Sequence, residues 1–291
     1  MEANGGRPPT GSEPPLARDA QVGRRRRIVR WIAALLAAYV AWVIFAYLNQ
    51  QRLVFPGVDL RRPATPGPGD PAVQQVWLTS ADGVNVESWY QPGRGRTAAA
   101  PGPAVMFFHG NYDLIDQSWS DQRGFLDLGV SVLVIEYRGY GRVAGVPSQE
   151  AIVADARMFR DWLANRPEVD ERRIIYRGRS LGGAVAAALA EHRPPAALIL
   201  ECTFTSLGAM AARYLLPGFL VEHPFRTEQV LARLDVPVLI FHGRYDAVVP
   251  SATAGGCVPW HRVRVILSWT VGTTTTAATG KRSSRFCGTL V

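Results

Sequence analysis

The chain has 291 residues, of which 47% are hydrophobic and 19% charged, and its formal net charge is +8. This length suits an anchor and one domain of about 240 residues, large enough to bury a full hydrophobic core. The excess positive charge lies in residues 1–30 and 251–291, and no basic face interleaved with aromatic residues occurs between them. The composition therefore argues against nucleic-acid binding, and we expect no nucleic-acid partner.

The sequence contains no pattern typical of a cofactor site. The three cysteines, Cys202, Cys257 and Cys287, form neither a disulfide framework nor a C-x-x-C pair. No metal-ligand spacing, phosphate-binding loop or dinucleotide fingerprint follows a predicted strand. We therefore expect no metal and no cofactor.

The N-terminal region predicts a membrane anchor. Residues 1–30 are rich in proline, glycine and charge, which favours a disordered basic tail. Residues 31–48 carry no charge, and at 1.5 Å per residue this stretch spans about 27 Å, enough for a bilayer core. Arginines at positions 24–27 and 30 predict a cytoplasmic N-terminus, with the rest of the chain on the extracytoplasmic side.

Two alternatives compete with this signal anchor. A cleaved signal peptide would need a small-x-small site, which residues 45–48 do not provide. A buried amphipathic helix would show a polar face, and none interrupts the apolar run. We therefore expect a single-pass membrane protein with a linker over residues 49–72.

Residues 73–250 predict one α/β domain. Alternating segments at 73–79 and 84–90 predict an antiparallel pair around Asp82-Gly83. Short apolar runs then predict strands, and periodic segments between them predict helices, including one of about a dozen residues that ends near Leu128. The strands are expected at residues 104–108, 131–135, 174–176, 197–200 and 237–241, and a further helix at 149–164. This alternation is typical of a parallel sheet with crossover helices, where ligands bind beyond the carboxyl ends of the strands.

Gly178-x-Ser180-x-Gly182 is the strongest chemical signal in the chain. It lies between a β-branched run and an alanine-rich helical segment, which is the order that a nucleophile elbow requires. The elbow holds a serine at a strained backbone position, and the flanking glycines allow the strand and the helix to approach. The alternative is a strand–helix turn with an incidental serine.

Further polar residues stand at the expected strand ends. Backbone N–H groups of Asn111, or alternatively Tyr112, and of Leu181 are candidates for an oxyanion hole. Asp246 is the candidate acid that would orient a histidine, with a simple turn residue as the alternative and Glu201 as the runner-up acid. His109 is expected to form local hydrogen bonds at a buried strand end and not to act as a base.

Residues 207–226 allow two interpretations. Their apolar side chains, among them Tyr214, Leu215, Leu216 and Phe219, suit the lining of an acyl pocket. An ordinary core helix would show the same composition.

From about residue 73 to Pro250 the chain resembles the membrane-anchored α/β-hydrolase-domain proteins, in their lysophospholipase-like and serine-aminopeptidase-like branch. Six sequence blocks occur in the expected order: His109-Gly110-Asn111, Tyr137-Arg138-Gly139-Tyr140-Gly141, Gly145-x-Pro147-Ser148, Gly178-Arg179-Ser180-Leu181-Gly182-Gly183, Phe204-Thr205-Ser206 and His242-Gly243-x-x-Asp246-x-Val248-Val249-Pro250. The resemblance implies an α/β-hydrolase fold with a mostly parallel, doubly wound sheet behind one transmembrane helix. It also implies Ser180 as the nucleophile, Asp246 as the triad acid, and an acyl-enzyme intermediate.

The C-terminal segment departs from this pattern. The resemblance implies a triad histidine near Thr274, where the chain has four consecutive threonines, and His261 is the only histidine after Asp246. Residues 251–291 also contain none of the chain's 24 acidic residues. We interpret this segment as aberrant, either because it is read in a shifted frame or because the terminus is naturally degenerate. We expect the last strand, at residues 263–267, and the closing helix to be incomplete.

The sequence thus predicts a serine hydrolase that cleaves an ester, thioester or amide. An acyl or lipid-like ester is the favoured substrate, because the anchor keeps the site near a bilayer. The alternatives are a non-catalytic pseudo-hydrolase or binding protein that lacks the triad histidine, and a serine peptidase of the same fold. The sequence leaves the oligomeric state open.

Overall fold

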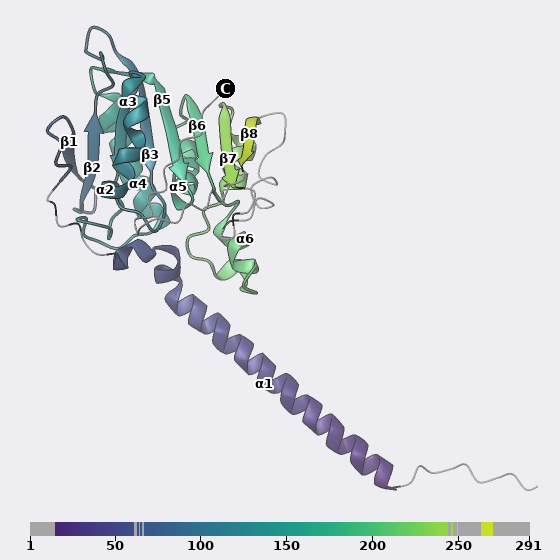
Figure 1. Cartoon of the computed structure of the whole chain (residues 1–291). Helices are drawn as coiled ribbons and strands as arrows, with labels where there is room; N and C mark the ends of the chain where they lie inside the picture. The colour runs from purple at the N-terminus through teal and green to yellow at the C-terminus, as the bar shows by residue number, and fades with distance from the viewer. Residues whose placement is uncertain are drawn as a thin grey trace, which may run out of the picture.

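The computed structural model describes residues 15–60, 63, 65, 67–243, 246, 249 and 263–269, and the account below concerns these residues. Their core is a sheet of eight strands in the order β1-β2-β4-β3-β5-β6-β7-β8 (Figure 1). The strands are β1 (Gln74–Thr79), β2 (Asn85–Gln91), β3 (Gly102–Phe108), β4 (Ser131–Ile135), β5 (Val169–Arg179), β6 (Ala197–Glu201), β7 (Val238–Gly243) and β8 (Val263–Trp269).

Most of the sheet is parallel. Strand β2 pairs antiparallel with both β1 and β4, whereas all other neighbouring pairs, from β4–β3 to β7–β8, are parallel. Every residue of β4 is buried, as expected for a strand covered on both faces. The predicted α/β-hydrolase sheet is therefore confirmed.

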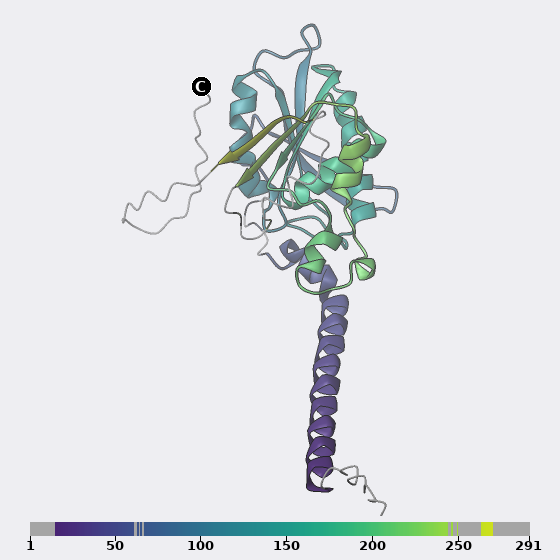
Figure 2. The ribbon, with the colours of Figure 1, turned by 90° about the vertical axis from the view of Figure 1, so that its right-hand side faces the viewer.

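Helices cover both faces of the sheet (Figure 2). One core cluster joins the sheet to α4 (Gln149–Ala164), α5 (Leu181–His192) and α7 (Thr227–Arg233). A second cluster joins the other face to α2 (Ile115–Ser118), the 3-10 turn η2 (Trp119–Gln122) and α3 (Arg123–Asp127). The remaining helical elements beyond the sheet are α6 (Leu207–Ala212) and η3 (Gly218–Leu220).

The helical segment predicted before Leu128 is present over residues 115–127, but it is not one continuous helix, because the chain forms α2, η2 and α3 there. At their junction the Gln122 side-chain amide donates to the Ser118 carbonyl at 3.2 Å. In a continuous helix that carbonyl would accept the backbone N–H of Gln122. The side chain thus competes with the backbone, and residues 119–122 tighten into a 3-10 turn.

Helix α1 is longer than expected. It runs over Pro15–Val54 and is followed by a 3-10 turn, η1, at Pro56–Asp59. Residues 15–30 are therefore helical and not a disordered tail, and the linker does not begin at residue 49. Arginine, alanine, glutamine and leucine propagate a helix at low cost once the apolar stretch has formed it.

Helix α1 also meets the criteria for a membrane span. Within Gly23–Val54, an 18-residue window has a mean hydropathy of 2.1, and the helix is long and apolar enough to cross a bilayer, criteria that signal sequences also meet. It extends away from the sheet (Figure 1), and its apolar side chains are mostly exposed.

The sheet continues past residue 250, where the domain was expected to end. The predicted strand at residues 263–267 is confirmed as β8, which pairs in parallel with β7. This β-branched run adds one more strand to the edge of the sheet, while the expected domain boundary stays a prediction. The expected closing helix falls on residues 270–291, outside the described residues.

Candidate active site

Ser180 occupies the turn between β5 and α5. Its backbone angles are φ 52° and ψ −116°, a left-handed conformation that is strained for a residue with a side chain. Its backbone N–H donates to the carbonyl of Glu201, at the end of β6, over 2.7 Å. The strand–turn–helix order that was predicted around this serine is present.

The flanking glycines are explained by backbone contacts. A Cβ atom on Gly178 would lie 2.2 Å from the Gly182 carbonyl oxygen, and a Cβ on Gly182 would lie 2.0 Å from that of Phe108. A Cβ on Gly183 would lie 1.8 Å from Thr203 Oγ1. Strand β5, helix α5 and the end of β3 therefore meet too closely for any side chain, which fixes the direction of the turn.

The His109-Gly110-Asn111 turn lies beside the serine. A Cβ on Gly110 would be 4.0 Å from Ser180 Cβ. Leu181 is the first residue of α5, so its backbone N–H has no acceptor one turn earlier in the helix. The Asn111 carbonyl accepts a hydrogen bond from the Tyr140 hydroxyl at 3.4 Å, which ties this turn to the next loop. The two candidate oxyanion donors therefore belong to adjacent backbone turns, while their role stays a prediction.

His109 forms local hydrogen bonds, as expected. Its side chain is fully buried, with Nε2 2.8 Å from Glu136 Oε1 and Nδ1 2.8 Å from the Gly110 carbonyl. The other oxygen of Glu136 accepts the backbone N–H of Ile115. Both ring nitrogens are occupied, so His109 orders the turn and does not face the serine hydroxyl.

Asp246 lies at the end of β7, two strands away from Ser180. Its Oδ1 accepts the Val249 backbone N–H at 2.8 Å, so it also holds its own turn, as the alternative interpretation expected. Its carboxylate interacts with the Cys202 thiol, and burial raises the pKa of that thiol. The Cys202 N–H donates to Phe241, and the neighbouring Thr203 hydroxyl donates to the Ser180 carbonyl at 3.3 Å. The ends of β5, β6 and β7 thus connect the serine to the candidate acid through residues 202 and 203.

Glu201, the runner-up acid, belongs to a structural ion pair. Its Oε1 lies 2.5 Å from Arg177 Nε. The Arg177 guanidinium also stacks over the rings of Phe107 and Phe125, at 5.1 and 5.3 Å. A carboxylate held in this way is not available to orient a catalytic histidine, which favours Asp246.

Within the described part of the chain, no histidine nitrogen hydrogen-bonds to Ser180. His242 Nε2 donates to the Val249 carbonyl at 2.6 Å, and His223 lies at a separate pocket. The two positions considered for the triad histidine, His261 and Thr274, lie outside the described residues. The base that would activate Ser180 therefore stays a prediction.

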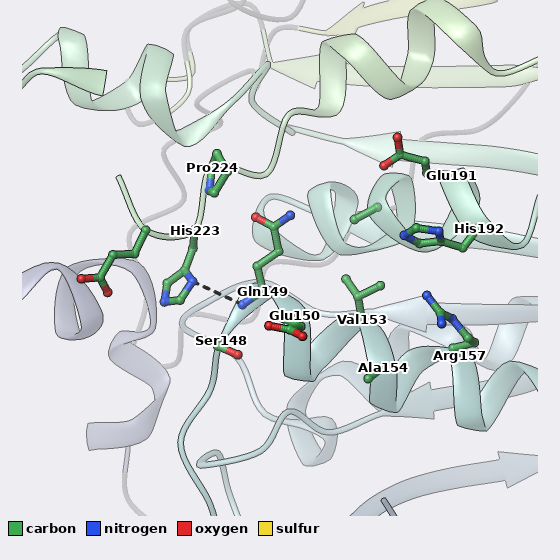
Figure 3. A pocket seen from close by; sticks show the side chains of 12 residues that line it. Ser148, Gln149, Glu150, Val153, Ala154, Arg157, Glu191, His192, His223 and Pro224 are labelled. Carbon is green, nitrogen blue, oxygen red and sulfur yellow. Dashed lines mark hydrogen bonds between the residues drawn. The ribbon is translucent and has the colours of Figure 1, made fainter. Parts of the chain in front are cut away.

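A cavity of about 570 Å³ lies between α4, α5 and residues 222–224 (Figure 3). Its lining includes ionisable side chains, namely Glu150, Arg157, Glu191, His192, Glu222 and His223. Neither Ser180 nor Asp246 borders it. Because its walls are polar and it lacks the nucleophile, we do not assign the chemistry to this cavity.

An ion cluster next to the nucleophile escaped the sequence analysis. Arg179 forms an ion pair with Asp113 and lies 3.5 Å from Asp121. Burial lowers the pKa of Arg179, but the carboxylates of Asp113, Glu201 and Asp121 together outweigh burial, so the pKa is raised and the guanidinium stays charged. No sequence pattern links partners this far apart. Among the described residues, no group of three or more His, Cys, Asp or Glu side chains could hold a metal ion.

Comparisons with known proteins agree with this geometry. Residues 99–225 match the family described as serine aminopeptidase, S33. An uncharacterized protein of Mycobacterium tuberculosis is 38% identical over 231 residues, which cover 76% of this chain and 77% of that protein. The α/β-hydrolase domain-containing protein WAV2 of Arabidopsis thaliana is 34% identical over 251 residues, covering 77% and 80%.

A solved structure supports the same fold. The Pyrococcus furiosus esterase PF2001 superposes with a TM-score of 0.55 at 19% identity, over 72% of this chain and 87% of that one. At this identity the likeness concerns the arrangement of strands and helices alone.

Proposed function

Because the chain belongs to the α/β-hydrolase family, we propose that it is a serine hydrolase that cleaves acyl esters through Ser180. The observation that carries the proposal is the conformation of Ser180, with φ 52° at the junction of β5 and α5. Backbone strain of this kind clusters at functional sites, and in a nucleophile elbow it serves to expose the serine hydroxyl above the sheet. The glycine contacts around it leave the turn no alternative path.

The proposed reaction follows from the groups around the turn. Ser180 Oγ attacks the carbonyl carbon of the substrate while a histidine accepts its proton. The N–H groups of Leu181 and Asn111 hold the resulting oxyanion, and each such donor contributes about 3 kcal/mol to transition-state stabilisation. The tetrahedral intermediate then collapses, and the histidine returns the proton to the leaving alcohol. Water hydrolyses the acyl-enzyme by the same steps, with Ser180 as the leaving group.

Two residues are proposed to complete this site. Asp246 orients the histidine, because Glu201 is committed to Arg177. His261 is the candidate base in this chain, as the only histidine that follows Asp246.

The proposed substrate class and location rest on α1. Its exposed apolar side chains, such as Trp31 at 67% and Leu48 at 73%, have no partner in the described domain that would bury them. We propose that α1 crosses a membrane with the arginines at 24–27 on the cytoplasmic side, so that the domain is extracytoplasmic. A site held beside a bilayer favours lipid-like acyl esters over peptides.

Labelling with a fluorophosphonate probe tests the nucleophile. The purified full chain is expected to label in a time-dependent manner, and Ser180→Ala is expected to abolish that labelling. Ser120→Ala, which removes an exposed serine, serves as the matched control and keeps the wild-type rate. Equal labelling of wild type and Ser180→Ala would instead identify a non-catalytic member of the family.

The same assay separates the auxiliary residues. Asp246→Asn and His261→Ala are each expected to slow labelling by at least about tenfold, since losing a triad member removes most of the activation of the serine. Glu201→Gln is expected to leave the rate within about threefold, because its role is structural. Comparing p-nitrophenyl acyl esters with aminoacyl anilides then distinguishes the esterase from the peptidase.

A further inference from the structure

The segment at residues 207–224, called here the α6–η3 loop, is an excursion from the sheet. It leaves after β6 and returns before α7, and its two ends are joined by a hydrogen bond from Leu207 N–H to the Pro224 carbonyl at 2.9 Å. Neither α6 nor η3 contains a buried residue. Of the segment 207–226, α6 and η3 are therefore not a buried core helix, although Leu207 and Met210 pack against the core and Phe225 belongs to it.

The tip of the loop presents apolar side chains outward. Phe219 is 86% exposed, Leu215 74% and Tyr214 60%. Leaving such surface in water costs about 25 cal/mol per Å², and a contiguous apolar patch marks an interaction surface. Nothing in the described domain packs over these three side chains.

The loop lies along α1. The Tyr39 hydroxyl donates to the Leu215 carbonyl and the Trp42 indole N–H donates to the Tyr214 carbonyl, both at 3.0 Å. Nearer the domain, Glu222 N–H donates to Gln50 Oε1 at 3.1 Å. Figure 1 shows α6 beside the domain-proximal end of α1, below the sheet.

These contacts fix the depth of the loop relative to the membrane span. Trp42 and Tyr39 lie well inside the uncharged stretch 31–48, six and nine residues before its end. At 1.5 Å per residue this is about 9 to 13 Å along the helix axis. Apolar faces that lie in a membrane interface penetrate about 5–10 Å, so the tip reaches the depth of the upper acyl chains.

We propose that the α6–η3 loop is immersed in the bilayer that α1 crosses, with Leu215 and Phe219 among the acyl chains. The inference rests on the proposed role of α1 as an anchor. The occupant of the surface is lipid, because a bilayer surrounds α1 at the level where the loop contacts it. The loop begins four residues after Thr203, whose hydroxyl donates to the Ser180 carbonyl, so the chain leads from the serine turn into the loop within a few residues.

Depth-dependent fluorescence quenching tests this inference in the full chain. Cys202, Cys257 and Cys287 are replaced by serine, and a nitrobenzoxadiazole label is attached in turn to Phe219→Cys, Leu215→Cys, Leu36→Cys and Leu128→Cys. The protein is reconstituted into phosphatidylcholine vesicles with or without nitroxide-labelled lipid. Leu36 reports on the middle of α1. Leu128, which is 77% exposed, lies just before β4 and reports on the end of the sheet where the parallel strands begin.

Both loop labels are expected to lose fluorescence to the lipid nitroxide to an extent comparable with Leu36, and several times more than Leu128. Loop labels that behave like Leu128 while Leu36 is quenched would overturn immersion and leave the anchor intact. Loop labels shielded from both lipid nitroxide and aqueous iodide would indicate a protein partner or a second copy, which also overturns it. An unquenched Leu36 label would overturn the anchor itself, whereas the Ser180 labelling assay is independent of all these outcomes.

Discussion

The nucleophile elbow and the α6–η3 loop are connected through residues 201–206, but different forces hold them. At the elbow, backbone atoms of three elements approach so closely that positions 178 and 182 have no room for a Cβ. At the loop, the chain is secured by hydrogen bonds at its base and along α1, while its apolar side chains point outward. Packing inside the protein therefore fixes the conformation of the elbow, whereas the surroundings of the protein determine what the apolar side chains of the loop contact.

The largest effect is expected from adding a methyl group at the elbow. In Gly182→Ala the new Cβ would lie 2.0 Å from the Phe108 carbonyl oxygen, and neither backbone segment can yield. We expect the variant to lose cooperative thermal unfolding or soluble expression altogether. The matched control is Gly124→Ala in α3, where a Cβ meets nothing within 4 Å. That change is expected to be neutral or to stabilise the fold by about 0.5–1 kcal/mol, since alanine is the better helix former. Equal effects of the two changes would contradict the backbone explanation of the motif.

The next largest effect contrasts a residue at the tip of the loop, Phe219, with Phe225, which follows the loop directly. Phe225 is 1% exposed and packs in the main core, whereas Phe219 is 86% exposed. We expect Phe225→Ala to lower the free energy of unfolding by about 3–5 kcal/mol, the usual cost of an aromatic cavity. In detergent solution, Phe219→Ala is expected to change it by less than about 0.5 kcal/mol. Urea denaturation followed by tryptophan fluorescence measures both, and a large loss in Phe219→Ala would mean that the tip is packed against protein.

The same contrast explains what the sequence could predict. The bounds of β4 and α4 agree with the predicted ones. Strand β4 is a short run of buried residues and α4 is buried along one face, and both patterns can be recognised in the order of apolar residues in the sequence. The elbow could be predicted because glycine is the only residue that fits there. The loop could not, because apolar residues facing a lipid and apolar residues facing a core look alike in a sequence. The Arg179–Asp113 pair was missed because only the fold brings the ends of β5 and β3 together.

The smallest effect concerns the attachment of the loop base to α1 through His223. The Gln149 backbone N–H donates to His223 Nδ1 at 3.5 Å (Figure 3), and the His223 Nε2 lies 3.3 Å from Gln51 Oε1. An Nδ1 that accepts a hydrogen bond must be unprotonated, so this arrangement requires the neutral ring. Burial lowers the pKa of His223 below its ordinary value of 6.5, while the nearby carboxylate of Glu222 partly opposes this shift.

The sign of the resulting pH dependence is fixed by that shift. Above its ordinary pKa, His223 is neutral in both the folded and the unfolded chain, and its contribution to stability is fully present. As the pH falls through 6.5, the unfolded chain binds the proton first, so stability declines. We expect the melting temperature of the wild type to fall more than that of His223→Gln between about pH 7.5 and about pH 5.5. His192→Gln, at an exposed position, is the control and should follow the wild type. If the melting temperature of His223→Gln falls as much as that of the wild type, the loop base does not need a neutral histidine. Its contacts with α1 would then be as insensitive to pH as the backbone contacts of the elbow.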